Sequence, residues 1–343
     1  MATGMGFGIC AVLLGGTLQA SVFFPMKFTK RWQWENIWAC FSIVAYLLSP
    51  WVLACLLVTH FPQMLWDIRP STLITTLLFG VGMGCGALMM GLAYSYVGMA
   101  IVFAIVLGIS SSIGSLVPLI VLAPEQLLRH QGLSTMAGVL VALAGTAVVG
   151  WAGWERDARK TGDGAAVQTT EGGSTRKLWI GLGLSVGSGL LSSCANLGFA
   201  FGGQISERAH ALGAGPTGAA SALWSVILLP VFLFNFGYSS YLLGKNRSAD
   251  LFRLPGTIHY WGLGIAMGLG WMAGMTSYGV GALSLGRLGT AIGWVLFSSS
   301  MIIVANVLGL FTGEWKGASV KAGVIMAVGI AILTVAIAVV GAA

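Results

Sequence analysis

The sequence predicts an all-α integral membrane protein with ten transmembrane helices, arranged as two inverted five-helix repeats. Three observations predict it. Of the 343 residues, 57% are hydrophobic and only 8% are charged, against roughly 45–50% and about 25% in an average soluble domain. The charged residues are gathered between apolar stretches long enough to cross a bilayer. Finally, the two halves of the chain are weakly similar to each other.

Each apolar stretch defines one expected helix. In chain order they are 5–26, 37–59, 71–93, 98–123, 133–151, 178–203, 216–242, 260–283, 288–312 and 322–342. None of the 17 Lys and Arg or 10 Asp and Glu residues lies inside them, as expected when a charge at a helix centre costs about 2.5–3.5 kcal/mol. The first stretch lacks a basic leading segment and a clean cleavage site, so we expect it to be retained.

The longest polar segment, 153–177, is rich in charged residues, Gly, Ser and Thr. This composition is typical of a flexible linker. The predicted organisation is therefore a first five-helix repeat at 1–152, a linker at 153–177 and a second five-helix repeat at 178–343.

Basic residues are distributed unevenly between the two sides of the bundle. With ten crossings, the side of both termini carries four Lys and Arg residues and the other side carries thirteen, the linker included. The positive-inside rule predicts a multi-pass protein of the cytoplasmic (inner) membrane, with a cytoplasmic linker and both termini on the non-cytoplasmic side.

The internal similarity predicts a duplication. Ser110-Ser111-Ser112 recurs as Ser298-Ser299-Ser300, and other matches keep the same order along both halves. A five-helix unit crosses the membrane an odd number of times, so its second copy is inverted. Inverted repeats suit alternating access to a site at the bilayer midplane. The alternative to a transporter is a membrane scaffold, sensor or assembly subunit with the same symmetry.

Polar and aromatic residues inside the spans are the candidate substrate-binding groups, because a polar solute there needs hydrogen-bonding partners and ring faces. Six residues form this set: Gln19, Asn196, Trp271, Tyr278, Ser299 and Asn306. The structural alternative for the serine is a hydrogen bond to its own helix backbone, and for the tryptophan it is packing against lipid or a neighbouring helix.

Proton coupling needs a titratable group, and the spans contain no Asp or Glu. Candidates therefore come from helix ends: Glu35, Glu207 and His259. A carboxylate at a helix N-terminus and a solvated histidine are the structural alternatives. Sodium coupling and facilitated diffusion stay open.

Other functions have little support. Phosphate-binding, metalloprotease and nucleophile-elbow motifs are missing, so we expect no enzyme. The five cysteines show no metal-ligand spacing, and no basic face with interleaved aromatics suggests nucleic acid. We expect no cofactor and no bound metal. The last helix of each half, 133–151 and 322–342, is rich in Ala, Val and Gly. This composition suggests contact with another copy in a homodimer.

Several motifs resemble the L-rhamnose/proton symporter family within the drug/metabolite transporter superfamily. They are Phe24-Pro25-Met26-Lys27, Lys30-Arg31-Trp32-Gln33-Trp34-Glu35, Leu48-Ser49-Pro50-Trp51, Glu207-Arg208-Ala209-His210 and Asn235-Phe236-Gly237. The resemblance covers essentially the whole chain. It implies ten helices in two inverted repeats and uptake of a deoxy sugar with a proton. Glu35, Glu207, Trp271 and Tyr278 match the family's positions, whereas Gly274 replaces a glutamine and Gly203 a lysine.

The leading hypothesis is thus a secondary active transporter that takes up L-rhamnose or a related deoxy sugar with a proton by alternating access. The alternative on the same fold is an exporter or exchanger of apolar metabolites or cationic drugs.

Overall fold

The computed structural model describes residues 2–160 and 174–342 as a bundle of long helices. The first half contains α1 (Ala2–Ser21), η1 (Phe24–Phe28), α2 (Trp34–Ser42), η2 (Ile43–Leu48), α3 (Ser49–Leu57), α4 (Phe61–Met64), η3 (Leu65–Asp67), α5 (Pro70–Val97), α6 (Met99–Leu122), η4 (Pro124–Gln126) and α7 (His130–Lys160). The second half contains α8 (Ser174–Ser192), α9 (Cys194–Phe201), α10 (Gly203–Ala211), α11 (Pro216–Lys245), η5 (Ala249–Arg253), α12 (Ile258–Ser284), η6 (Gly286–Leu288), α13 (Gly289–Phe311) and α14 (Val320–Gly341).

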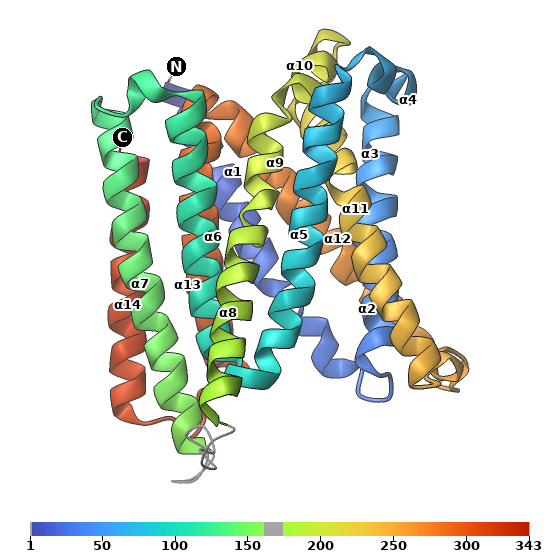
Figure 1. The fold of residues 1–343 in the computed structure, drawn as a ribbon, viewed down its shortest axis with the longest axis vertical. Helices are drawn as coiled ribbons and strands as arrows, with labels where there is room; N and C mark the ends of the chain where they lie inside the picture. The colour runs from blue at the N-terminus through green and yellow to red at the C-terminus, as the bar shows by residue number, and fades with distance from the viewer. Residues whose placement is uncertain (1, 161–173, 343) are drawn as a thin grey trace.

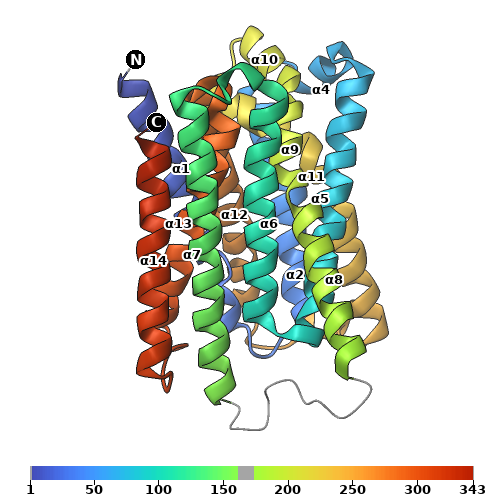
Figure 2. The same ribbon diagram turned by 60° about the vertical axis from the view of Figure 1, so that its left-hand side comes forward.

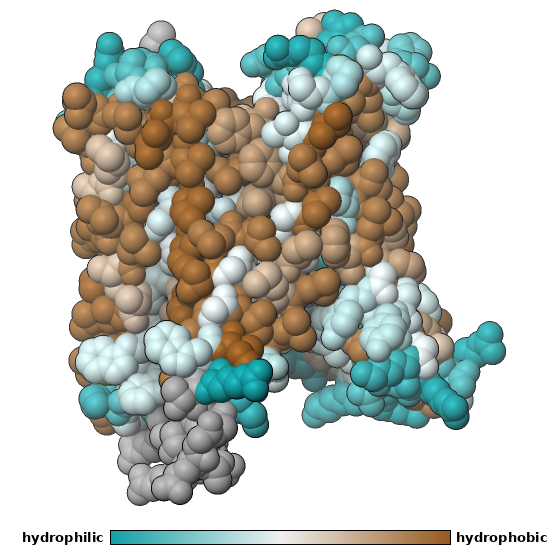
Figure 3. All heavy atoms as spheres, viewed as in Figure 1, coloured by the Kyte–Doolittle hydropathy of each residue, from teal (hydrophilic) through white to brown (hydrophobic). Residues whose placement is uncertain are grey.

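Both ends of the chain lie at the same end of the bundle, which we call the terminal end (Figure 1). The opposite end, where α7 finishes and α8 begins, is the linker end (Figure 2). The surface in Figure 3 is a broad apolar belt between two hydrophilic ends. Such a belt is what a bilayer requires of a spanning protein.

Nine segments of the described residues are helical, long and apolar enough to cross a membrane. The predicted stretch at 260–283 is not among these nine. It forms α12, which is 27 residues long but rich in glycine and carries Trp, Tyr and His side chains. The all-helical class is therefore confirmed, while the count of ten stays a prediction.

Several boundaries differ from those predicted. The first helix stops at Ser21 and is followed by the short 3-10 helix η1, because Pro25 lacks an amide donor and restricts the residue before it. Helix α7 continues to Lys160, so the start of the expected linker is helical. Residues 161–173 of the expected linker lie outside the described residues, and 174–177 form the start of α8.

Two of the spans are irregular. The second consists of α2, a π-helical turn at Ile43–Leu48 and α3, where Pro50 cannot donate a hydrogen bond to the preceding turn. The sixth is divided into α8, α9 and α10 at Ser193 and Gly202. A side chain at Gly202 would contact Leu223 and the Gly198 carbonyl. Tight packing therefore fixes this bend.

Helices of one half pack against helices of the other. Helix α1 packs against α12 and α13, and α8 packs against α5 and α6. The last helices, α7 and α14, pack against each other through glycines: a Cβ on Gly145 would lie 2.8 Å from Leu333, and one on Gly329 would lie 2.6 Å from Val149. The hydrophobic core lies among these helices, around the buried rings of Trp224 and Tyr278.

Candidate functional site

Asn196 and Tyr278 join four helices at the centre of the bundle. Both side chains are fully buried. The Asn196 amide donates hydrogen bonds to the carbonyl of Gly114 on α6, at 2.6 Å, and to that of Thr290 on α13, at 3.0 Å. The Tyr278 hydroxyl, on α12, donates to the amide oxygen of Asn196. Two of the predicted residues are thus in direct contact, but both amide protons of Asn196 are already used by the protein.

The break after α8 positions Asn196. Helix α9 begins at Cys194, directly after Ser193, whose hydroxyl donates to the Leu190 carbonyl of the preceding turn. This backbone bond by a serine side chain favours a bend. Asn196 then lies in the first turn of the new helix segment, facing α6 and α13.

Tyr278 lies within a group of aromatic rings. Its ring centroid is 5.7 Å from that of Phe199, 6.3 Å from Trp224, 5.2 Å from Trp294 and 5.2 Å from Phe297. The Trp224 indole donates to the Met275 carbonyl at 3.0 Å, and the Trp294 indole to the Ser110 carbonyl at 3.0 Å. Because both indole N–H groups are bonded to the protein, neither is left to bind a solute. We call this group of five packed rings the aromatic wall.

Gly114 makes room for this wall. A Cβ at Gly114 would lie 2.6 Å from the Trp294 ring. About one helical turn away on each helix, the hydroxyls of Ser111 and Ser298 are 2.8 Å apart and join α6 to α13. The two serine triplets that suggested a duplication therefore meet where their helices cross.

Gln19 is the predicted residue with the most unused hydrogen-bonding capacity. Its Nε2 atom reaches only the thioether sulfur of Met275, at 3.6 Å, and its buried Oε1 has no partner. A Cβ on Gly274 would lie 3.1 Å from that oxygen. A buried amide oxygen without a partner is costly for the protein alone. It is therefore the best-placed group here to bind a hydroxyl of a solute.

Trp271 lies one helical turn from Gly274 on α12 and is 5% exposed. Its ring meets Tyr46 edge to face, with centroids 4.9 Å apart and an interplanar angle of 89°. Tyr46 was not predicted. It continues a series of aromatic contacts that runs through Trp34, Trp38 and Phe41.

The spacing of this series carries a signal that helical periodicity alone misses. The steps from 34 to 38 and from 38 to 41 are the four and three residues of an α-helix, but the step to Tyr46 is five residues. The π turn at Ile43–Leu48 brings that fifth residue onto the same face. At the middle of the series, the Trp38 indole donates to the Asn235 amide oxygen at 3.1 Å.

Ser299 and Asn306 lie on a different face of α13. Ser298 faces Ser111 of α6, and Ser300 faces α1, where a Cβ on Gly16 would strike its hydroxyl. Around the axis of α13, the direction of Ser299 differs by about 100° from that of Ser298 and from that of Ser300. The structure therefore turns it away from Tyr278, which contacts the Trp294 and Phe297 face. Asn306 is seven residues further on the same face and donates to the Ile302 carbonyl of its own helix.

Glu35 is a buried carboxylate at the linker end, only 4% exposed. It accepts hydrogen bonds from the Ser248 hydroxyl at 2.6 Å and from the Asn246 amide at 2.9 Å. Next to it, Asn36 donates to the Ser248 carbonyl at 2.9 Å. These bonds tie the start of the second span to the connection that follows α11.

The other two coupling candidates are exposed. Glu207 lies on α10 at the terminal end, whereas Glu35 lies at the linker end. His259 lies in the first turn of α12 and packs its ring on Tyr260, with centroids 4.5 Å apart. The structure does not bring the three together. Within the described ranges, no group of three His, Cys, Asp or Glu side chains could hold a metal ion.

The sequence model of the L-rhamnose-proton symport protein family matches residues 1–343 of the chain. The L-rhamnose-proton symporters of Escherichia coli O1:K1 / APEC and of Escherichia coli strain SMS-3-5 are each 30% identical to it, and that of Shigella boydii serotype 18 is 29% identical. In each case the match covers 99% of this chain and 98% of the relative. The chain therefore belongs to the L-rhamnose-proton symport protein family.

Proposed function

We propose that this protein takes up L-rhamnose or a related deoxy sugar together with a proton, by alternating access. Family membership supports this class of transport. The observation in the structure that carries the proposed site is the unpaired, buried amide oxygen of Gln19, which lies beside Gly274 of α12, one turn from Trp271. The amide would bind sugar hydroxyls and the indole face would pack on the apolar side of the ring.

The packing pattern supports ten spans in two inverted repeats. Helix α12 is 27 residues long, which corresponds to about 40 Å, more than the hydrocarbon thickness of about 30 Å. With α12 counted as the eighth span, span 1 (α1) packs on spans 8 and 9 (α12 and α13). In the same way, span 6 (α8) packs on spans 3 and 4 (α5 and α6). The two sets correspond when each span of the first half is matched with the span five places later. The superfamily resemblance carries the same expectation.

Alternating access would use the bonds between the two halves. Glu35 binds Ser248 and Asn246, and Lys27 binds Glu314 at 2.6 Å, so both contacts link a connection of the first half to one of the second at the linker end. Opening the bundle at this end would break them. Among the three coupling candidates, Glu35 is the one whose protonation would change such a contact directly.

The orientation and oligomeric state follow as further parts of the proposal. The linker end is assigned to the cytoplasm by its excess of Lys and Arg, which puts both termini on the other side. A homodimer through α7 and α14 would use their outer faces, where Leu140 and Val335 are exposed. Their glycines are already used by the α7–α14 contact.

The proposal is tested with purified protein in proteoliposomes under an imposed pH gradient. Labelled L-rhamnose should accumulate only when the proton gradient points in the direction of uptake, and sodium gradients should have no effect. Accumulation without proton movement would refute the coupling, and exchange of sugars without net uptake would favour the exchanger alternative. A reporter at either terminus that proved cytoplasmic would overturn the orientation.

A further inference from the structure

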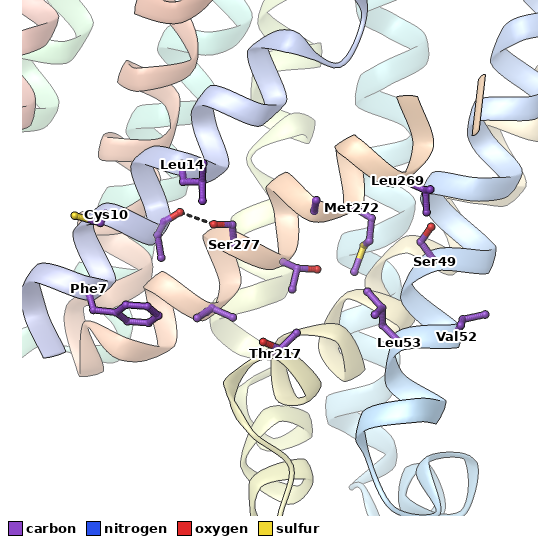
Figure 4. Close-up of a pocket in the computed structure, with 14 residues that line it drawn as sticks. Phe7, Cys10, Leu14, Ser49, Val52, Leu53, Thr217, Leu269, Met272 and Ser277 are labelled. Carbon is purple, nitrogen blue, oxygen red and sulfur yellow. Dashed lines mark hydrogen bonds between the residues drawn. The ribbon is translucent and has the colours of Figure 1, made fainter. Parts of the chain in front are cut away.

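A separate cavity opens on the membrane-facing side of the bundle. It lies between α1, α3 and α12 and has a volume of about 660 Å³ (Figure 4). Phe7, Leu14, Val52 and Leu269 line it, and each is at least half exposed. Exposed Leu, Val and Phe side chains at this level of spanning helices face lipid rather than water. The cavity is therefore reached from the bilayer.

The cavity is an elongated groove. Leu269 and Val280 of α12 both line it, and the 11 residues between their positions correspond to about 16 Å along the helix. In Figure 4, Phe7 lies at one end of the groove and Leu269 and Ser49 lie near the other, with Thr217 of the first turn of α11 below the middle. The shape suits an extended chain better than a compact sugar ring.

Two hydroxyls in the groove have no hydrogen-bond partner in the protein. Ser49 and Thr276 are 8% and 9% exposed, and the Oγ of the first and the Oγ1 of the second are buried and unpaired. The neighbouring Ser277 differs, because its hydroxyl donates to the Ala11 carbonyl at 2.7 Å. Buried polar groups are almost always paired. The two free hydroxyls thus point to a ligand that supplies the missing partner.

The rest of the groove limits the ligand's charge. Among the described residues that line it, none is charged, so a cationic ligand would find no carboxylate there. Thr276 is also eight residues before the end of α12, or about 12 Å along the helix. A phospholipid's ester groups lie at the interface, outside the hydrocarbon core. Its acyl chain would fill the groove without pairing the hydroxyls.

We infer that this groove binds an uncharged amphiphile from the bilayer, with its polar head hydrogen-bonded at Ser49 or Thr276 and its apolar chain along α12. A long-chain alcohol is the simplest member of this class. The site is distinct from the one at Gln19, since Gln19, Trp271 and Tyr278 are not among its lining residues. The inference stands independently of which sugar is transported.

Photocrosslinking of the protein in lipid nanodiscs tests this site. The probe is a dodecanol carrying a diazirine, with labelled peptides identified by mass spectrometry and with 1-dodecanol, dodecane and dodecylammonium as competitors. We expect labelling of α1, α3 and α12 peptides, and competition by 1-dodecanol at concentrations at least tenfold lower than those of the other two. Equal competition by dodecane would show acyl-chain filling only and would overturn the inference, as would stronger competition by the cation.

Two pairs of variants locate the site. Thr276→Val combined with Ser49→Ala should remove the preference for the alcohol over dodecane. Thr334→Val is the matched control, because that exposed hydroxyl bonds to the Ile330 carbonyl of its own helix. Ala273→Phe should block labelling, since Ala273 is exposed and lines the groove. Ala266→Phe, at an exposed position of α12 outside the lining, should not. Unchanged labelling in a folded Ala273→Phe protein would place the probe elsewhere.

Discussion

The hydroxyls of Ser111 and Ser298 are 2.8 Å apart, and each residue lies in the fourth predicted apolar stretch of its half. Their hydrogen bond lies at the crossing of α6 and α13, beside the wall formed by Trp294 and Tyr278. The contact between the two serine triplets is therefore small and polar.

Gln19→Ala should raise the KM for sugar uptake by about five- to tenfold, the effect of losing about one hydrogen bond. The reason is that the Gln19 amide has almost no protein partners to lose. Thr17→Val, two residues away at an exposed hydroxyl, is the control. Uptake kinetics in proteoliposomes measure both, and an unchanged KM in Gln19→Ala would remove this residue from the site.

Glu35→Gln should abolish accumulation driven by a proton gradient while retaining sugar counterflow. The amide of glutamine is close to the carboxyl in shape and can still accept from Ser248, but it cannot be protonated in the pH range of transport. Glu207→Gln and His259→Gln should keep normal coupling, because both side chains are exposed and lie away from this contact. Coupling lost in either of these two variants instead would contradict the choice of Glu35.

Tyr278→Phe should lower the free energy of unfolding by about 1–3 kcal/mol, the cost of leaving a buried acceptor unpaired. The variant removes the donor to the Asn196 oxygen and leaves the aromatic packing in place. Tyr96→Phe is the matched control, since the Tyr96 side chain is 39% exposed. Unfolding in detergent by denaturant, followed by tryptophan fluorescence, separates the two variants. Equal stability would show that the Tyr278 bond contributes nothing measurable.

Gly145→Ala should destabilise the α7–α14 contact by about 1–3 kcal/mol, as expected of overpacking. A Cβ there would lie 2.8 Å from the Leu333 side chain and 3.1 Å from its backbone nitrogen. Gly323→Ala, on α14 with no atom within 4 Å, should be neutral or slightly stabilising. The melting temperatures of the two proteins in detergent give the comparison.

The Lys27–Glu314 pair should give a small, pH-dependent stabilisation. The hydrogen bond and charge of Lys27 lower the pKa of Glu314 below its usual value of 4.5, against the opposing effect of burial. A lowered folded-state pKa means that the contribution is present above about pH 4.5 and is lost as the pH falls through the folded value. Both side chains are about half exposed, at 44% and 48%, so the effect should stay below about 1 kcal/mol and shrink with salt.

The measurement for this pair is the stability of Glu314→Gln relative to the unmodified protein at pH 7 and at pH 4. The difference should be seen at pH 7 and be smaller at pH 4. A difference that grows as the pH falls would have the wrong sign for this ion pair.

Much of the helical arrangement was predictable because apolar length and the exclusion of charge are local properties. The stretch 98–123 became α6 at Met99–Leu122, and 322–342 became α14 at Val320–Gly341. The contact between Asn196 and Tyr278 unites two predicted residues, since a buried amide and a buried hydroxyl must find partners.

Other features depend on the direction of a side chain around its helix, which spacing in sequence does not give. Ser298 faces the crossing whereas Ser299 turns away, and both belong to the same triplet. The pairing of Glu35 with Ser248 joins residues 213 positions apart, so no local pattern reveals it. Tyr46 escaped notice because an α-helical repeat places it off the face that it actually shares with Phe41.

The π turn at Ile43–Leu48 sets the rotational phase between the two ends of the second span. An ordinary α-helix at that point would rotate everything beyond it by about 100° for each residue removed or added. With Trp38 held by Asn235 on one side of the turn and Tyr46 against Trp271 on the other, the wide turn acts as a spacer of one residue. A single deletion there would preserve the hydrophobic span and yet force the helix to give up one of these two contacts.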